Sequence, residues 1–432
     1  MDEGALFPPD SDLDLSFTSC ASTTATTRTF TSSSPRTSLT LSFNENRLST
    51  TSTTTTTHEH RRPHRESDPH WSAIKAATNL SCDGTLHLRH LKLLRHLGTG
   101  NCGRVFLCRL RDNDHANFAL KVVDRDSLTD KKLSHVQTEA QILSSLDHPF
   151  LPTLYAHIDV SHYTCLLIDY CPNGDLHSLL HKQPGYRLSV ESVRFYAAEV
   201  LGALEYLHSL GVVYRDLKPE NVLLREDGHI MLSDFDLCFK ADVVPKLENR
   251  THHHKVGSTK KRWRQRHRKP DEVVTEFTAE PTTAFSRSCV GTHEYLAPEV
   301  VTGNGHGNGV DWWAFGVLIY ELLYGRTPFK GESKEATLRN IASTRGVRLH
   351  ATERVEEEVG MAEAMDLIER LLVNDPRKRL GCVGGATEIK QHPFFNGIKW
   401  PLIRNYRPPL VARKGKAHVL VDEGEESHPW TI

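Results

Sequence analysis

Four polar residues near the middle of the chain have the types and spacing that phosphoryl transfer requires. Asp216, Lys218 and Asn221 fall within the short stretch Tyr214–Asn221, and Asp234 follows it after a short predicted hairpin. A carboxylate can accept a proton, an ammonium group can bind phosphate, and carboxylate and amide oxygens are hard ligands for Mg²⁺. This set of groups predicts transfer of a phosphoryl group from ATP.

A glycine-rich stretch, with Gly98, Gly100 and Gly103, lies upstream of these residues. Alone it also fits a dinucleotide-binding turn, which should open a helix. Here the residues from Val105 onward favour a second strand, and a strand–turn–strand glycine loop folds over phosphates. Glycine lets the backbone approach phosphate where a Cβ would clash. The glycines become informative because further partners follow in order: Lys121, Glu139, Asp216, Asp234 and Ala297-Pro298-Glu299.

Two sets of elements must position these residues. The first is a sheet with one helix, and its expected elements are strands 105–110, 117–123 and 165–170 and helix 134–146, which carries Glu139. The second is mostly helical, with amphipathic or apolar helices over 190–210, 310–324 and 362–373. We therefore expect an α+β fold of two lobes, with a small antiparallel β-sheet lobe containing one helix and a larger, mainly α lobe.

The composition divides the chain further. More than half of residues 16–57 are Ser or Thr, which predicts a disordered tail over residues 1–85 with candidate phosphoacceptors. The small lobe is expected over 86–171 and the large lobe over 172–395. A mobile basic insertion is expected at about 246–282 within the large lobe. Residues 396–432 are expected to form a C-terminal tail on the surface.

Charge and cysteine content limit the class of protein. Lys and Arg total 53 against 54 Asp and Glu, so no nucleic-acid partner is expected. Nine cysteines without C-x-x-C pairs indicate reduced thiols in the cytoplasm or nucleus. The acidic N-terminus predicts no signal peptide, and the longest apolar stretch is too short to span a bilayer. We expect a monomer.

The chain resembles the protein kinases from about Leu91 to Pro408, which implies the bilobal protein-kinase fold for the two lobes. Lys218 after Asp216 resembles the serine/threonine class, and Tyr214 before Arg215 resembles the AGC group. Two further stretches carry the AGC resemblance, Gly291–Glu299 and Asp375–Gly381. The resemblance implies that Glu299 and Arg379 form a buried ion pair and that Asp311 braces the catalytic loop.

The resemblance also implies roles around the nucleotide. Lys121 should hold the α- and β-phosphates of ATP, with Glu139 orienting it, and the backbone at Asp169 and Cys171 should meet the adenine. Apolar residues should enclose the adenine, although the same positions also suit plain core: Leu97, Val105, Ala119 and Leu223. Asn221 and Asp234 should bind Mg²⁺.

On the protein-substrate side, Asp216 should accept the proton of the substrate hydroxyl, and Lys218 should steady the γ-phosphate. Thr292 should line the acceptor site. Asp175 and Glu220 match positions that favour Arg or Lys upstream of the target Ser or Thr, or they are solvated surface acids. Both interpretations stay open on sequence alone.

Regulation should centre on two serines. Ser288 occupies the position of the AGC activation phosphate, and Ser286 is its near neighbour. A phosphate there could pair with Arg215 and order the loop. Local sequence does not rank the two serines, because Arg287 separates them.

Asp236 replaces the last Gly of the Asp-Phe-Gly motif and precedes a long insertion, which resembles the plant AGC kinases. Within these, Asp12–Ser19 and Asp68–Trp71 resemble the WAG/PINOID subfamily. That subfamily implies phosphorylation of PIN auxin efflux carriers. Asp visits positive φ less freely than Gly, so we expect a stiffer or differently posed loop, with Asp234 still present as the metal ligand.

The block Lys255–Lys269 carries clustered Lys and Arg around Trp263. It fits anionic membrane lipids, a nuclear import signal or plain solvated charge. We expect a cytoplasmic protein that is peripheral at the cell membrane, with the nucleus as the other location. Residues 410–432 contain no Phe-x-x-Phe motif. The rival functions are a catalytically weak kinase-fold scaffold and a membrane-associated adaptor.

Overall fold

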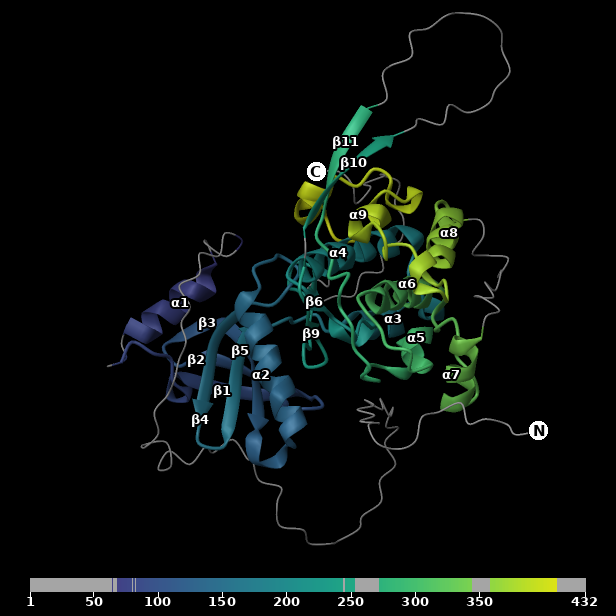
Figure 1. Cartoon of the computed structure of the whole chain (residues 1–432). Helices are drawn as coiled ribbons and strands as arrows, with labels where there is room; N and C mark the ends of the chain where they lie inside the picture. Colours follow the sequence, from purple (N-terminus) through teal and green to yellow (C-terminus); the bar gives the residue numbers. More distant parts are fainter. Residues whose placement is uncertain are drawn as a thin grey trace, which may run out of the picture.

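The computed structural model describes residues 64, 68–79, 81, 83–243, 245–252, 272–343 and 358–409. They form a small lobe built on a five-stranded antiparallel sheet and a larger helical lobe (Figure 1). The expected bilobal α+β kinase fold is confirmed. The Ser/Thr-rich residues 16–57, the basic block Lys255–Lys269 and residues 410–432 lie outside the described residues.

The small-lobe sheet has the strand order β1-β2-β3-β5-β4, and every neighbouring pair is antiparallel. Its strands are β1 (Leu91–Thr99), β2 (Arg104–Leu110), β3 (Asn113–Asp124), β4 (Leu154–Val160) and β5 (Tyr163–Asp169). In β3, Phe118, Leu120 and Val122 belong to an outer apolar cluster. Alternation along a strand therefore places Ala119 and Lys121 on the opposite face.

Helix α2 (Asp130–Ser145) packs on that inner face, where Val136 joins Val123 in a buried cluster. Thr129 begins the helix, because its hydroxyl accepts a hydrogen bond from the Lys132 N–H at 3.4 Å. The helix is four residues longer at its start than the sequence predicts. It carries Glu139 inward, toward β3.

Helix α1 (Pro69–Asn79) covers the outer face of the sheet, where Ala73 and Ile74 are buried (Figure 1). Just before it, Asp68 Oδ2 accepts a hydrogen bond from the Tyr155 hydroxyl at 2.8 Å. The prediction of a tail over residues 1–85 is wrong for this segment. Its few apolar residues suffice because they pack on an existing sheet, not because they form a core of their own.

The large lobe is organised around two long buried helices, α4 (Val190–Ser209) and α6 (Gly309–Tyr324), both near their predicted bounds. Gly325, with φ 71°, ends α6 in the left-handed conformation that favours glycine. The other helices are α3 (Leu176–His181), α5 (Pro298–Val301), α7 (Lys334–Ala342), α8 (Met361–Leu371) and α9 (Gly385–Lys390). No helix in the described ranges is long and apolar enough to cross a membrane.

Two small two-stranded antiparallel sheets lie at the junction of the lobes. β6 (Val212–Val213) pairs with β9 (Phe239–Lys240), and β7 (Val222–Leu224) pairs with β8 (Ile230–Leu232). The catalytic loop, residues 214–221, runs between β6 and β7. This arrangement brings the predicted base and the predicted metal ligands to one place.

The insertion contains two antiparallel strands, β10 (Lys246–His252) and β11 (Glu272–Thr278), which extend from the large lobe at the top of Figure 1. The predicted mobile insertion over 246–282 therefore needs correction at its described ends. Strand pairing orders both flanks, and Glu280 is buried in the large lobe. Sequence did not reveal this, because charged and polar residues dominate both strands.

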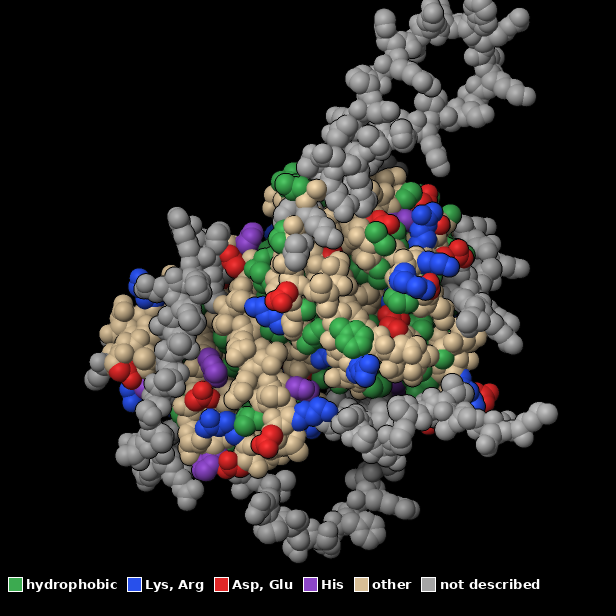
Figure 2. All heavy atoms as spheres, viewed as in Figure 1, with side chains coloured by type: hydrophobic (Ala, Val, Ile, Leu, Met, Phe, Trp, Pro, Cys, Tyr) green, Lys and Arg blue, Asp and Glu red, His purple; other side chains and the backbone are tan. Residues whose placement is uncertain are grey.

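The described surface is mixed in charge. On the face in Figure 2, Lys and Arg side chains are interspersed with Asp and Glu over both lobes. This agrees with the near-zero net charge of the chain. A strong single-sign field, of the kind that attracts nucleic acid, is not visible on the described part of this face.

Candidate active site

Lys121 lies in a buried ion pair at the base of the small lobe. Its Nζ is 2.7 Å from both Glu139 carboxylate oxygens and 3.3 Å from Asp234 Oδ1. Burial alone would favour the neutral amine, but the carboxylates of Glu139 and Asp234 raise the pKa of Lys121. The Lys121 cation of β3 is thus held between two acids, Glu139 of α2 and Asp234 of the segment after β8.

The three glycines of the loop between β1 and β2 have different environments. A Cβ on Gly103 would lie 2.6 Å from the Val122 carbonyl oxygen, so the packing of β2 on β3 itself requires glycine there. A Cβ on Gly98 would meet nothing within 4 Å. Gly100 donates its N–H to the Gly103 carbonyl at 2.8 Å. The space beside Gly98 and Gly100 is what a phosphate would use.

The predicted adenine-slot residues lie where the lobes meet. Val105 pairs with Lys121 across β2 and β3, and Leu107 pairs with Ala119. Ala119 is buried, while Leu97, Val105 and Leu223 are half-buried and so retain accessible apolar surface. An adenine ring could cover that surface.

The two predicted hinge residues differ in what their side chains do. The Asp169 carboxylate accepts hydrogen bonds from the Thr153 N–H at 2.7 Å and the Tyr155 hydroxyl at 3.1 Å. It therefore fixes β5 against β4. Cys171 is half-buried, with its Sγ 4.0 Å from the Met231 sulfur. A role of the backbone at these two residues in binding adenine stays a prediction.

Three of the predicted residues surround the Asp216 carboxylate: Lys218 and Asn221 from the catalytic loop, and Thr292 from outside it. Asp216 Oδ2 is 2.8 Å from Lys218 Nζ and 2.9 Å from Asn221 Nδ2. Its Oδ1 accepts the Thr292 hydroxyl at 3.0 Å, and Lys218 Nζ is 2.9 Å from the same hydroxyl oxygen. Burial raises the pKa of Asp216, and Lys218 opposes that rise. The arrangement brings together a base, a cation and a hydroxyl-binding position.

Asp311 holds this loop from below. Its Oδ2 accepts the Tyr214 N–H at 2.8 Å, and its Oδ1 accepts the Arg215 N–H at 2.7 Å. Arg215 and Asp234 both have positive φ, 67° and 57°. Such conformations persist only where surrounding contacts impose them. The prediction that Asp311 braces the loop is confirmed by these contacts.

The other predicted structural ion pair is also present. Arg379 is fully buried and donates to both Glu299 oxygens, at 2.7 and 2.8 Å. It donates further to the carbonyl oxygens of Gly309 and Val373. The bidentate guanidinium–carboxylate pair and the two carbonyl acceptors together offset the free-energy cost of removing these charges from water.

Asp236, the departure from the usual glycine, is buried beside the cation site. Burial and the neighbouring Asp234 carboxylate raise the pKa of Asp236 to about 7. Cys102 of the glycine loop has its Sγ 3.7 Å from Asp236 Oδ2. The residue does not need the conformation that glycine would supply, because Asp236 is not among the positive-φ residues.

The two predicted substrate acids have different surroundings. Asp175 is not an unpaired cleft carboxylate, because its side chain accepts the Ser178 N–H at 2.6 Å and caps α3. Glu220 lies near Glu294 and Glu321. Burial, together with the Glu220 and Glu294 carboxylates, raises the pKa of Glu321 to about 7. Sequence reasoning did not assign Glu321 a role, although an acid within the otherwise apolar stretch Trp312–Tyr324 was the available signal.

The two candidate phosphoserines lie at different distances from Arg215. Arg215 Nη1 is 3.2 Å from Ser286 Oγ, and Ser286 Oγ also accepts the Ser288 N–H at 3.2 Å. Ser286 pairs by backbone with His306. In this structure the arginine therefore contacts Ser286, and no contact with the Ser288 side chain is seen among the described residues.

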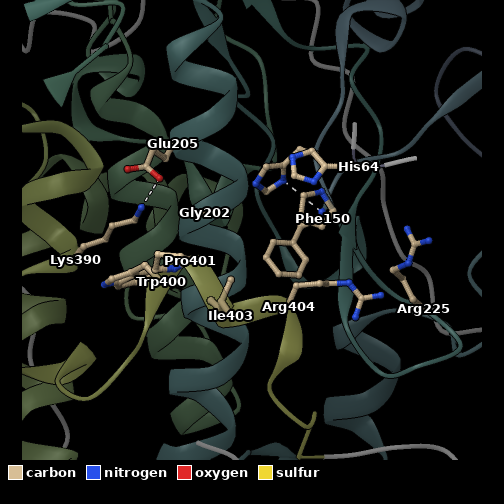
Figure 3. Close-up of a pocket in the computed structure, with 12 residues that line it drawn as sticks. His64, Phe150, Gly202, Glu205, Arg225, Lys390, Trp400, Pro401, Ile403 and Arg404 are labelled. Atoms are coloured by element: carbon tan, nitrogen blue, oxygen red, sulfur yellow. Dashed lines mark hydrogen bonds and ion pairs between the residues drawn. The ribbon is translucent and has the colours of Figure 1, made fainter. Parts of the chain in front are cut away.

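A separate cavity of about 500 Å³ lies between α4, the β7–β8 hairpin and the C-terminal segment Trp400–Asn405 (Figure 3). None of the predicted site residues lines it. Its cations are paired with acids: Lys390 with Glu205, Arg404 with Asp227, and Arg225 with Asp169. Because these cations are already paired with acids, the lining of the cavity does not indicate a particular ligand.

The residues offered for Mg²⁺ fit that ion. Asn221 uses its Nδ2 to hold Asp216, and within the described chain its Oδ1 receives no hydrogen bond. The Asp234 side chain is 33% exposed. Mg²⁺ typically takes one or two protein oxygens and completes its shell with water and phosphate. Among the described residues, no group of three or more His, Cys, Asp or Glu could hold a metal alone.

The comparisons with known proteins agree with this geometry. A model of the protein kinase domain matches residues 91–259 and 273–395. This chain belongs to the protein kinase family. It is 68% identical to serine/threonine-protein kinase WAG1 of Arabidopsis thaliana over 366 residues, which is 82% of this chain and 76% of that protein.

Two further relatives define the subfamily. Serine/threonine-protein kinase WAG2 of Arabidopsis thaliana is 68% identical over 81% of this chain and 74% of its own length. Protein kinase PINOID 2 of Oryza sativa subsp. japonica is 45% identical over 85% of this chain and 87% of its own length. The chain is thus a serine/threonine kinase of the plant AGC type, similar to the WAG and PINOID kinases. As a member of this family, it uses ATP and acts on protein substrates.

Proposed function

We propose that this kinase transfers the γ-phosphate of Mg²⁺-bound ATP to Ser or Thr in basic segments of its substrates, in auxin transport signalling. The observation that carries the proposal is the contact set around Asp216, with Lys218, Asn221 and Thr292 all within 3.0 Å of its carboxylate. Lys121 and Glu139 complete the site across the cleft between the lobes. These are the groups that phosphoryl transfer requires.

The proposed mechanism assigns each group a separate task. Lys121, held by Glu139, binds the α- and β-phosphates, and Asn221 and Asp234 hold Mg²⁺. Bound Mg²⁺ supplies positive charge to the phosphates. The substrate hydroxyl displaces Thr292 from Asp216 and passes its proton to that carboxylate. As its oxygen bonds to the γ-phosphorus, the bond between that phosphorus and the oxygen bridging to the β-phosphate breaks, and ADP is the leaving group. Lys218 follows the γ-phosphate as charge builds, because a point charge can track a moving anion.

Recognition of basic substrates is proposed to rest on Glu220, Glu294 and Glu321. Burial and the neighbouring Glu220 and Glu294 carboxylates make Glu321 costly to ionise, as its raised pKa indicates. An Arg or Lys of the substrate would relieve that cost. Asp175 has a smaller part in this proposal than was expected from its position in the sequence, because its side chain caps α3.

Activation is proposed to use a phosphate on Ser286 or Ser288. The contact between Arg215 and Ser286 supports Ser286 as the direct partner of the guanidinium. A phosphate on Ser288 would need a local rearrangement of residues 286–288 to reach Arg215. The two serines can be separated by mass spectrometry of active protein and by alanine substitution of each.

The cellular role is proposed from resemblance. Similarity to the WAG and PINOID kinases supports PIN-type auxin efflux carriers as substrates. We propose a monomer that is cytoplasmic and peripheral at the cell membrane, held at anionic lipids through Lys255–Lys269, with the nucleus as the other location. Sedimentation with vesicles that contain phosphatidylserine, with Lys260, Lys261, Arg262 and Arg264 neutralised in a variant, tests lipid binding directly. Unchanged binding by that variant would exclude this block as the lipid contact.

A peptide array with labelled ATP tests the proposed activity. The expected result is incorporation into Ser and Thr peptides with upstream Arg or Lys, and into the cytoplasmic loop of a PIN-type carrier. Matched peptides with Ala in place of the basic residues are the controls. Absence of incorporation into every peptide, with ATP binding retained, would favour the kinase-fold scaffold.

A further inference from the structure

The chain re-enters the large lobe after β11 through a buried carboxylate, Glu280, whose side chain is 5% exposed. Its Oε2 is 2.7 Å from His208 Nδ1 and 2.8 Å from Asn308 Nδ2, and its Oε1 accepts the Ala386 N–H at 3.1 Å. Gly385 has φ 63°, and a Cβ there would collide with the Glu280 side chain. The lobe is therefore built to receive this carboxylate.

His208, on α4, connects Glu280 to Asp311. Its ring is fully buried, and its Nε2 is 2.9 Å from Asp311 Oδ2. Ionised carboxylates only accept hydrogen bonds, so both ring nitrogens must donate and the ring must be an imidazolium. Burial opposes this charge, but the carboxylates of Glu280 and Asp311 together raise the pKa of His208 to about 10.

Asp311 continues the chain of contacts to the catalytic loop. The oxygen that faces His208, Oδ2, also accepts the Tyr214 N–H, and Oδ1 accepts the Arg215 N–H. These two amides immediately precede Asp216. The positive φ of Arg215 shows that the loop needs such contacts to keep its conformation.

We propose that Glu280 is a positioning residue for phosphoryl transfer, which fixes Asp216 through His208 and Asp311. Without the Glu280 carboxylate, the ring would lose the negative charge beside Nδ1 in a fully buried setting, and a neutral ring could turn a lone pair toward Asp311. Glu280 lies two residues beyond β11, so the described end of the insertion is tied to the catalytic loop. Glu280 touches none of the reacting groups. This role of Glu280 rests on the kinase activity of the chain and does not depend on which substrates are phosphorylated.

Steady-state kinetics of Glu280→Gln on a basic Ser peptide test the role in positioning. Because a displaced catalytic group costs rate even when binding is intact, we expect kcat to fall by about tenfold while the KM for ATP changes little. His208→Gln should have a similar effect. Since both residues act through Asp311, the double variant should be no slower than the slower single variant, whereas independent effects would multiply.

Hydrogen exchange of the amides of Tyr214 and Arg215 provides a readout that does not depend on activity. In Glu280→Gln these amides should exchange faster than in the wild type, while amides in the small-lobe sheet should not change. The loss in melting temperature of this variant should be larger at pH 6.5 than at pH 10. In the wild type, His208 keeps its proton until the pH rises through about 10, and its ion pairs are lost above that pH.

Glu369→Gln, at an exposed carboxylate of α8, is the matched control and should leave kcat and amide exchange unchanged. Multiplicative effects in the double variant, or unchanged exchange at Tyr214 and Arg215 in Glu280→Gln, would overturn the proposal. A fall in kcat that simply follows the folded fraction, measured by circular dichroism, would reduce Glu280 to a stabilising residue. If the wild type itself does not phosphorylate the peptide, the proposed preference for basic substrates fails instead, and the exchange experiment still decides the role of Glu280.

Discussion

Two buried charge clusters in this kinase have opposite characters. In the cleft cluster of Lys121, Glu139 and Asp234, the Asp234 side chain is 33% exposed. In the large-lobe pair of Arg379 and Glu299, the side chains are 0% and 8% exposed, and both carboxylate oxygens are taken. The first cluster can therefore still bind a ligand through the exposed part of Asp234. In the second cluster, both carboxylate oxygens are already occupied.

The difference indicates which charges serve chemistry and which serve the fold. Buried charges that are fully paired stabilise only as long as every partner is present. Buried charges that can still bind another group reduce the stability of the fold, and their presence in a cleft indicates a functional site. The Glu280–His208–Asp311 chain shares features with both clusters. Its charges are buried and paired like those of the second cluster, but Asp311 contacts the catalytic loop.

The largest expected effect comes from the cleft cluster. Asp234→Asn should reduce kcat on the order of 10³-fold, because it removes a charge on which transition-state stabilisation depends. Its melting temperature should stay close to that of the wild type, since the side chain is partly exposed. Parallel assays with labelled ATP and differential scanning fluorimetry check this. A large drop in melting temperature would mean that the cluster is mainly structural.

The large-lobe pair should respond in the opposite way. Glu299→Gln leaves the Arg379 charge buried without its carboxylate, and the free energy of unfolding should fall by about 3–5 kcal/mol. Urea denaturation measures it, and activity per folded molecule should be nearly retained. Arg377→Gln, in the neighbouring exposed pair with Asp375, is the matched control and should be close to neutral. Equal losses of stability in Glu299→Gln and Arg377→Gln would mean that burial does not set the contribution of the Arg379–Glu299 pair to the fold.

A pH experiment addresses the acids proposed to bind basic substrates. The pKa of Glu321 is raised to about 7, so its ionised fraction rises about tenfold between pH 6 and pH 8. Over that range the KM of an Arg-containing peptide should fall relative to that of its Ala counterpart, by up to about tenfold. Glu321→Gln should flatten the ratio. A pH-independent ratio in the wild type would exclude Glu321 from recognition.

The smallest expected effect is at helix α1. Asp68 accepts hydrogen bonds from the Tyr155 hydroxyl and the His70 N–H, and Asp68→Asn should cost about 1 kcal/mol of stability. Although burial opposes it, hydrogen bonding lowers the pKa of Asp68 to about 2. Its contribution is therefore present above pH 4 and lost as the pH falls toward 2. Urea denaturation at pH 7 and pH 3 should show the variant's deficit shrinking at the lower pH.

Sequence predicted the parts of this kinase whose chemistry is carried by residue type and spacing. The strand containing Lys121, the helix containing Glu139 and the catalytic loop all follow from local patterns. Contacts between residues distant in the chain could not be predicted in the same way. Glu280 meets His208 only through folding, Asp175 is used as a helix cap, and α1 is stabilised by a sheet that its own sequence does not encode.

The central claim is that Asp216 is the base of an active serine/threonine kinase. The most direct measurement is labelled phosphate transfer to a basic Ser peptide by the wild type and by Asp216→Asn, with ATP affinity measured in both. We predict transfer by the wild type, and a rate reduced by about 10²–10⁴-fold in the variant with ATP affinity retained. Transfer at an undiminished rate by Asp216→Asn would contradict the account.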